Sequence, residues 1–251
     1  MYTDSHCHIT EDRLYERIDE VLKNMHEVSN CMIMCTNETE FKRALALKET
    51  HPHFKIAFGW FPQDAKDITE KHIQILQKAI DSNQIDCLGE IGLDYYWDKS
   101  FINEQKELFI KQIQMANHAN LPISIHMREA TKDCLDILRE HAKTKIIFHC
   151  FSGSKETMNE CLKMGAYISF AGPITFKNNR QGVECATLCP LDKILTETDS
   201  PYLTPVPYRG KTNEPKYVEF TTKKICELKE IDVETLCAQI SNNFQSLFKE
   251  A

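Results

Sequence analysis

The sequence lacks a long hydrophobic run. No stretch approaches the roughly 18 consecutive apolar residues that a membrane-spanning helix requires. The first residues also show no basic segment followed by an apolar one, as a signal peptide would. These absences predict a soluble, cytoplasmic protein that does not enter a membrane, and nothing in the sequence predicts a protein partner.

An excess of positive charge is also lacking. The chain has 30 Lys and Arg residues against 37 Asp and Glu residues, a formal net charge of -7. A protein that coats a long nucleic-acid backbone needs the opposite balance, because cationic side chains must neutralise the phosphates. Any phosphate recognition by this chain must therefore be local.

The eleven cysteines include no tight Cys-x-x-Cys pair of the kind that binds zinc or exchanges disulfides. They are odd in number, and most lie inside apolar stretches. We expect reduced cysteines that fill the core. The alternative is a structural metal held by Cys31 and Cys35, or by Cys185 and Cys189, which are four residues apart.

What the sequence does contain is a regular alternation of two kinds of segment. Short apolar, β-branched runs that predict strands occupy residues 2–5, 31–35, 55–60, 87–93, 122–126, 145–150, 166–171 and 193–196. Helical periodicity covers residues 11–28, 38–50, 68–81, 104–120, 129–142 and 155–164. Because several strands are apolar throughout, they suit a parallel sheet that is covered on both faces. Eight such units predict an α/β fold, a (β/α)8 TIM barrel.

The end of the chain continues the same unit. A proline-rich stretch at residues 200–207 is followed by a basic segment and two helical runs, residues 217–228 and 233–248. No linker or internal repeat marks a boundary. With 251 residues and 42% hydrophobic content, the chain is predicted to form a single domain over residues 1–251.

His6 and His8 begin the chemistry. In a strand, side chains alternate between faces, so a one-residue gap points both imidazoles the same way. The pair alone fits packing or hydrogen bonding as well as it fits metal binding. The other candidate donors decide the question, because they also fall at strand ends: Glu90, His126, His149 and Asp199. Active sites of such barrels lie at the carboxyl ends of the strands.

Six converging imidazoles and carboxylates predict a metal centre, with His6, His8, Glu90, His126, His149 and Asp199 as ligands. Mixed nitrogen and oxygen donors suit zinc, manganese, cobalt or magnesium and hydrolytic chemistry. Two divalent ions fit, with Glu90 as the bridge and Asp199 as both a ligand and the base that accepts a proton from water. Glu197, which alternates with Asp199, is expected to orient a histidine.

Five motifs together resemble the TatD family of metal-dependent deoxyribonucleases. They are Asp4-Ser5-His6-Cys7-His8, Gly89-Glu90-Ile91-Gly92-Leu93-Asp94-Tyr95, His126-Met127-Arg128, His149-Cys150-Phe151-Ser152-Gly153 and Glu197-Thr198-Asp199-Ser200-Pro201-Tyr202. They occur in the family's order and span essentially the whole chain. The resemblance implies a (β/α)8 hydrolase, a one- or two-metal centre at the six ligands, and Mg²⁺- or Mn²⁺-dependent cleavage of phosphodiesters. Zn²⁺ is a further possibility. The implied substrate is DNA, often cut from the 3' end.

Other residues are predicted to contact such a substrate. Arg128 and Arg209 are expected to bind phosphate oxygens, and the Asn213 amide to add a hydrogen bond. Residues 201–224 carry five Lys and Arg against two Glu, a local positive segment. The aromatic rings of residues 95–97 fit either stacking on unpaired bases or packing of their own loop. The predicted partner is a DNA end, preferably single-stranded, because an unpaired terminus can enter a recessed barrel mouth.

One segment departs from the family pattern. The family commonly has Gly-x-His-Pro-His after the third strand, whereas this chain has Phe61 and Gln63 in place of the two histidines. This departure does not affect the predicted metal ligands, but it means that functions other than DNA cleavage must also be considered. A hydrolase of amides, lactones or aminoacyl esters is one alternative, and a metal-binding scaffold without nuclease activity is another.

Overall fold

The computed structural model describes residues 1–248, so the last three residues of the predicted domain lie outside the described residues. Eight parallel strands lie side by side in sequence order, each hydrogen-bonded to the next. The strands are β1 (Tyr2–Cys7), β2 (Val28–Cys35), β3 (Lys55–Phe58), β4 (Cys87–Asp94), β5 (Ile123–Arg128), β6 (Ile146–Phe148), β7 (Tyr167–Phe170) and β8 (Ile194–Thr196). All eight predicted strands are present, and the predicted barrel is confirmed.

The first and last strands nearly close the ring. The Thr196 hydroxyl donates to the carbonyl of Thr3 at 3.0 Å. Just beyond the strands, the Asp199 N–H donates to the carbonyl of His6 at 3.0 Å, and the His8 N–H donates to the carbonyl of Ser200 at 2.8 Å. These bonds bring the segment after β8 directly against the end of β1.

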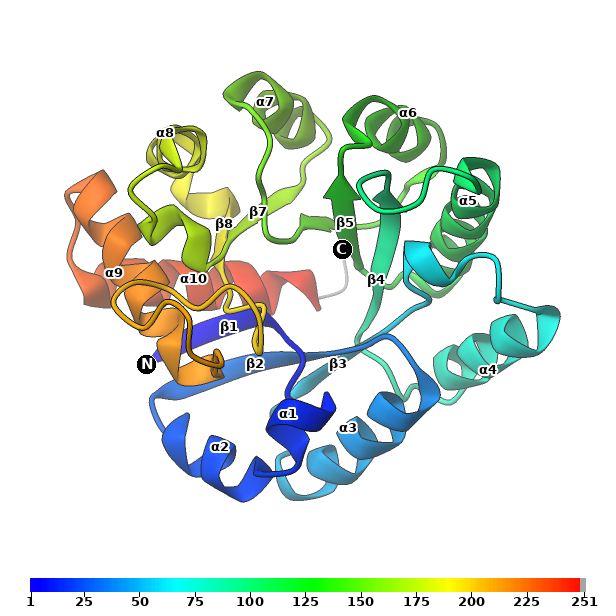
Figure 1. Cartoon of the computed structure of the whole chain (residues 1–251), viewed down its shortest axis with the longest axis horizontal. Coiled ribbons are helices and arrows are strands. Elements are labelled where there is room, and N and C mark those ends of the chain that lie inside the picture. Colours follow the sequence, from blue (N-terminus) through cyan, green and yellow to red (C-terminus); the bar gives the residue numbers. More distant parts are fainter. Residues whose placement is uncertain (249–251) are drawn as a thin grey trace.

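Helices surround the strands (Figure 1). The α-helices are α1 (Asp12–Tyr15), α2 (Ile18–Asn24), α3 (Glu38–Thr50), α4 (Glu70–Asp81), α5 (Ile102–Ala119), α6 (Thr131–His141), α7 (Lys155–Lys163), α8 (Arg180–Leu188), α9 (Val218–Lys229) and α10 (Val233–Leu247). The short 3-10 helices are η1 (Pro62–Asp64), η2 (Gly172–Thr175), η3 (Leu191–Lys193) and η4 (Pro215–Tyr217). Within residues 1–248, no helix has the length and apolar composition that crossing a membrane would take.

The predicted helix over residues 11–28 is wrong in its continuity. It is divided into α1 and α2 at Arg17, whose backbone (φ -129°, ψ 35°) is not helical. The Arg17 guanidinium donates to Glu214 at 2.7 Å, in the long segment after β8. A contact between residues so far apart in the sequence is invisible to local periodicity. Val28 belongs to β2 rather than to the helix.

The C-terminal helix α10 covers the amino ends of the strands. Asn243 donates to the carbonyls of Leu191 and Ile194 at the start of β8, both at 2.8 Å. The Lys145 ammonium donates to the carbonyl of Ser246 at 2.8 Å just before β6. In Figure 1 this helix crosses behind the barrel. One end of the barrel is thereby closed, and the other end is left for a site.

Gly92 allows β4 and β5 to approach closely. Its φ of 144° is rarely adopted by residues with a side chain, and a Cβ there would lie 2.0 Å from the carbonyl oxygen of His126. The two residues are register partners. A glycine at this position is therefore needed for the neighbouring strand ends to bring Glu90 and His126 together.

The cysteines behave as the sequence predicts. All eleven are unpaired, ten are buried, and Cys150 is half-buried. Cys7 points away from the neighbouring histidines, with its sulfur 3.3 Å from that of Cys31. They fill the core together with phenylalanines such as Phe58, Phe148 and Phe170.

Candidate metal centre

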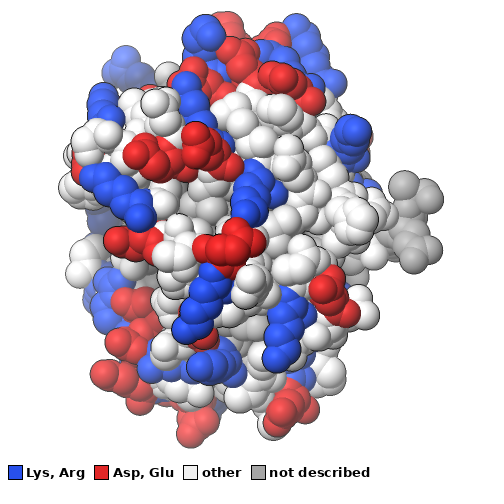
Figure 2. Space-filling view, turned by 90° about the vertical axis from the view of Figure 1, so that its right-hand side faces the viewer, with Lys and Arg blue, Asp and Glu red and all other residues white. Residues whose placement is uncertain are grey.

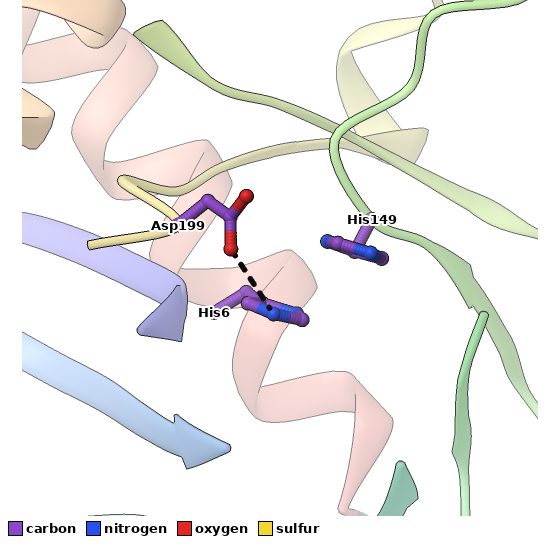
Figure 3. A group of neighbouring side chains, drawn as sticks. All are labelled: His6, His149 and Asp199. Atoms are coloured by element: carbon purple, nitrogen blue, oxygen red, sulfur yellow. Dashed lines mark ion pairs between the residues drawn. The ribbon is translucent and has the colours of Figure 1, made fainter. Parts of the chain in front are cut away.

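The six predicted ligands meet at the carboxyl ends of the strands. They come from the end of β1, from β4 and β5, and from the residues that follow β6 and β8. The rings of His6 and His149 are stacked with their centroids 4.0 Å apart, and the Asp199 carboxylate points toward the same space (Figure 3). Five of the six line a pocket of about 370 Å³, and His6 lies beneath them.

Four side chains form a first group of donor atoms. The Nε2 atoms of His6 and His8 are 3.1 Å apart. His6 Nε2 lies 3.5 Å from Glu90 Oε2 and 3.6 Å from Asp199 Oδ1. His8 Nε2 lies 3.6 Å from Glu90 Oε2 and 3.5 Å from Asp199 Oδ1. All four groups are largely buried, with His6 completely so. We call this group the first ion position.

Three side chains form a second group around the other oxygen of Glu90. Glu90 Oε1 is 2.7 Å from His126 Nδ1 and 2.8 Å from His149 Nε2. The two histidine nitrogens are 3.4 Å apart. We call this group the second ion position. The two oxygens of Glu90 therefore face the two positions separately, as a bridging carboxylate does.

The donor atoms fit divalent ions. Bonds of about 2.1 Å to a tetrahedral ion place neighbouring ligand atoms about 3.4 Å apart, and an octahedral ion places them about 3.0 Å apart. The donor separations at both positions span these values, from 2.7 Å to 3.6 Å. Imidazoles combined with carboxylates suit zinc, manganese or cobalt, and the carboxylates also suit magnesium.

Both carboxylates are ionised in their surroundings. Burial alone would raise the pKa of Glu90, but the charge of His149 and the hydrogen bonds of His126, His149 and His6 hold it well below its ordinary value. Burial acts in the same way on Asp199, and its contact with His8 and the nearby charges of His6 and His149 hold the pKa of that carboxyl below its ordinary value. Both side chains are thus ionised and ready to bind a cation.

Two further carboxylates lie beside the histidines of the second position. His126 Nε2 donates to Asp94 Oδ2 at 3.0 Å, and with a proton held there the neutral ring would offer Nδ1 to an ion. Glu197 Oε1 lies 3.4 Å from His149 Nδ1 and accepts the Cys150 N–H at 2.7 Å. The sequence predicts that Glu197 lies beside a ligand histidine, but it did not lead us to predict the contact of Asp94 with His126. The signal was present, because Asp94 is four residues beyond Glu90 and so lies on the same face of β4.

A buried carboxyl also fixes the turn that carries Asp199. Asp4 accepts hydrogen bonds from the Thr198 N–H at 2.9 Å and from its hydroxyl at 2.6 Å. Asp4 is completely buried, and burial raises its pKa to about 8 against the effect of these bonds. Sequence reasoning gave Asp4 no role. It ties β1 to the segment after β8, and so ties His6 to Asp199.

The three predicted substrate-binding residues have different positions. Arg128 lines the pocket beside His126. Arg209 is exposed, and its guanidinium stacks on the Phe176 ring at 4.3 Å, away from the lining residues. The expectation for Asn213 is wrong. Its side chain is completely buried, and its amide donates to the carbonyls of Thr198 and Tyr202, so it holds the loop instead of facing a substrate.

The predicted positive segment is largely neutralised within the chain. Lys216 pairs with Glu214 at 3.0 Å, Lys223 with Glu219, and Lys224 with Glu227 at 3.0 Å. Elsewhere, Figure 2 shows Lys and Arg side chains mixed with Asp and Glu over one whole face of the molecule. Positive charge at the site itself therefore comes from Arg128.

The segment after β3, which has Phe61 and Gln63 instead of the two histidines of the family pattern, contributes an aromatic ring to the pocket. The Phe61 ring lines the pocket and lies edge-on to His126, with 4.8 Å between centroids. The Gln63 side chain donates to the carbonyl of Asp94 at 2.8 Å and so supports the end of β4. The remaining six histidines do not line the pocket: His26, His51, His53, His72, His118 and His141.

The pocket wall beyond the metal ligands is acidic on one side. Glu40 and Asp64 line it near Phe61, and within residues 1–248 neither forms an ion pair with Lys or Arg. Glu40 is buried and accepts from the Thr36 N–H at 2.9 Å. Burial, together with the charges of Asp67 and Glu40, raises the pKa of Asp64.

The other side of the metal centre is mostly apolar. An adjoining pocket of about 410 Å³ shares five lining residues with the first one: His126, Arg128, His149, Asp199 and Tyr202. The rest of its wall is apolar or uncharged: Met127, Cys150, Ser152, Pro173 and Leu203. The ion positions therefore lie between an acidic side and an apolar side.

Comparisons with known proteins agree with this geometry. Residues 3–249 match the family model described as TatD related DNase. The chain is 39% identical over 253 residues to YabD of Bacillus subtilis strain 168, an uncharacterized metal-dependent hydrolase, covering 99% of each chain. It is 35% identical to YcfH of Escherichia coli K12, also an uncharacterized metal-dependent hydrolase, over 98% of this chain and 94% of that protein. The crystal structure of YJJV, a TatD homologue from Escherichia coli K12, superposes with a TM-score of 0.92 at 25% identity, covering 100% and 98% of the two chains.

Proposed function

Because the chain belongs to the TatD family of metal-dependent hydrolases, we propose that it hydrolyses phosphodiester bonds at unpaired DNA ends, from the 3' terminus. Two divalent ions, Mg²⁺ or Mn²⁺, with Zn²⁺ as the alternative, would be held by the six ligands. His6, His8 and Glu90 would hold one ion together with Asp199, which lies 3.6 Å from His6 and 3.5 Å from His8. Glu90, His126 and His149 would hold the other. Both the identity of the ions and the choice of DNA as the substrate belong to this proposal.

The observation that carries the proposal is the shared carboxylate. The two oxygens of Glu90 face separate groups of donors, at 3.5 Å from His6 and at 2.7 Å from His126. Two ions placed about 3.5 to 4 Å apart are the arrangement used by nucleases and phosphatases, where both the attacking and the leaving oxygen are stabilised. When bound, such ions polarise the phosphoryl group and make water acidic enough to act as a nucleophile near neutral pH.

The chain's own residues supply the remaining parts of the reaction. Asp199, ionised and at the edge of the pocket, accepts the proton of the attacking water on its carboxylate. Arg128 lies on the pocket wall, where its guanidinium can bind phosphate oxygens that remain outside the ion positions. Asp94 holds the His126 ring at 3.0 Å and thus keeps one ligand in place while charge shifts during the reaction.

A gel assay of single-stranded DNA labelled at its 5' end tests the proposal. Purified protein should shorten the strand only with Mg²⁺ or Mn²⁺, and the Asp199→Ala variant should not. His118→Ala, which removes an exposed histidine of α5, is the matched control and should behave as the wild type. Shortening without a metal ion, or shortening that survives Asp199→Ala, would show that another activity is responsible.

A second candidate is a hydrolase of amides, lactones or aminoacyl esters. It is favoured by the acidic side of the pocket, because Glu40 and Asp64 would repel a polyanion but accept an amine or hydroxyl group. A panel of such carbonyl substrates, measured beside DNA under the same metal conditions, separates the two. A higher kcat/KM on any carbonyl substrate would favour this candidate.

A further inference from the structure

Two exposed aromatic rings lie at the mouth of the metal pocket. Trp97 is 68% exposed and Tyr96 is 46% exposed, although large aromatic side chains usually bury most of their surface. Tyr95, the residue before them, does the opposite: it is buried, and its hydroxyl donates to Asp133 at 2.8 Å. Packing of the loop buries Tyr95, whereas Tyr96 and Trp97 meet each other edge to face, with 4.7 Å between centroids, and keep much of their surface in solvent.

An arginine completes this surface. The Arg128 guanidinium lies 3.8 Å from the centroid of the Tyr96 ring and 5.4 Å from that of Trp97. Trp97 and Arg128 both line the pocket that contains Glu90 and His126. The exposed Trp97 indole lies beside a cation that is itself stacked on Tyr96, and next to a centre that would hold a phosphate. Together they form a surface for a planar ring attached to that phosphate.

The rings are held in a fixed relation to the metal ligands. Asp94 accepts the Tyr96 N–H through Oδ1 at 2.9 Å and the His126 ring N–H through Oδ2 at 3.0 Å. One carboxylate thus joins the aromatic segment to a ligand of the second ion position. Farther along the same loop, Asp98 pairs with Lys66 at 3.0 Å. The surface is formed in advance, so stacking would cost little ordering of the protein.

From these contacts we propose that Tyr96, Trp97 and Arg128 form a platform that stacks an unpaired nucleobase of the substrate next to the scissile phosphate. The inference rests on the proposed function and adds the part of the substrate that the platform recognises. Since every base has an aromatic face, the platform would tolerate any sequence but would require that the base be unpaired. This requirement selects single strands over duplexes.

Binding measurements test the platform without relying on turnover. Every protein in the comparison carries Asp199→Asn, which slows cleavage, and the Mg²⁺ concentration is the same in all titrations, so the metal content is matched among the variants. The ligands are a fluorescein-labelled eight-nucleotide thymidine strand and the same strand without its three 3'-terminal bases, followed by anisotropy. Trp97→Ala should weaken binding of the intact strand about tenfold, the scale of one stacked base. It should change binding of the abasic strand less than about twofold.

Two further variants and one optical signal sharpen the test. Trp97→Phe keeps an aromatic face and should retain most of the affinity, whereas Leu188→Ala, which trims an exposed apolar residue of α8, should have no effect. The intact strand should quench the emission of Trp97, while the other tryptophan, Trp60, is buried and serves as the reference. Equal losses on both strands, or no loss on either, would overturn the platform. The separate absence of metal-dependent shortening by the wild type would overturn the proposed function, so the two failures can be told apart.

Discussion

The two ion positions share Glu90 but are built differently. The first has four direct donors: His6, His8, Glu90 and Asp199. The second has three, and Asp94 accepts the ring N–H of one of them, His126, at 3.0 Å. Glu197 lies 3.4 Å from His149 Nδ1, which, like His6 Nδ1, has no hydrogen-bond partner among the described residues. The first position thus has more ligands, whereas the second has a ligand that a further carboxylate orients. The first should therefore depend most on its ligands, and the second also on residues that never touch the ion.

The change with the largest expected effect removes the shared group. Glu90→Gln takes the charged oxygens from both positions at once, so both ions should be lost and activity should fall more than about 10,000-fold, the scale seen when groups that act as a unit are removed. Calorimetric titration with Mn²⁺ measures the loss. Glu104→Gln, an exposed residue of α5, is the matched control. Retention of one ion by Glu90→Gln would mean that the two positions are independent.

Asp199→Asn should affect the first position alone. The variant keeps the shape of the side chain but loses a charged donor that lies 3.5 Å from His8 Nε2, together with the proton acceptor. We expect one bound ion instead of two and a rate about 100- to 10,000-fold lower, the usual range for a missing base. Anomalous scattering from crystals soaked in Mn²⁺ would locate the remaining ion between Glu90, His126 and His149. An ion at the first position in this variant would contradict the assignment.

Asp94→Asn should weaken the second position without touching an ion. The amide cannot replace the negative charge that faces His126 Nε2. The affinity of the second position for its metal ion should therefore fall about 10- to 100-fold. Affinity at the first position should stay within about twofold, because none of its donors contacts Asp94. Two-site calorimetry distinguishes these outcomes. In parallel, NMR of the imidazole nitrogens should show that His126 loses its preference for a proton on Nε2, a signal that general destabilisation would not produce.

The smallest expected effect is a dependence on pH. Burial alone would lower the pKa of His126 and of His149, but Glu90 together with Asp94 or Glu197 outweighs burial and raises both pKa values. In the metal-free protein these histidines therefore stabilise the fold below the ordinary histidine pKa of about 6.5, and this stabilisation is lost as pH rises through the raised values. Metal binding needs the neutral rings and strengthens over the same range.

The measurement compares Tm with Mn²⁺ and with a chelator across this pH range. The difference between the two Tm values should grow as pH rises, by about 2–4 °C for each kcal/mol of added binding energy. A difference independent of pH would mean that the histidines of the second position are not protonated before the ion binds.

Much of the fold and of the site could be predicted because the relevant signals are local. Apolar runs of strand length mark all eight strands, and donors placed at their ends identify Glu90, His126 and His149 as a group. The errors fall where the answer depends on distant residues. Arg17, where the predicted helix breaks, pairs with Glu214 in the segment after β8, and the Asn213 amide donates to the carbonyls of Thr198 and Tyr202.

By itself, the sequence determined the barrel and the set of donor residues. Alternation of side chains along a strand and the common direction of parallel strands are enough to bring those residues to one end. Only the tertiary structure decided which donors share an ion, that Asp94 joins His126 to Tyr96, and that Tyr95 is buried while Trp97 is exposed. These facts depend on distances of 3 to 4 Å between strand ends and loops, which no spacing along the chain specifies.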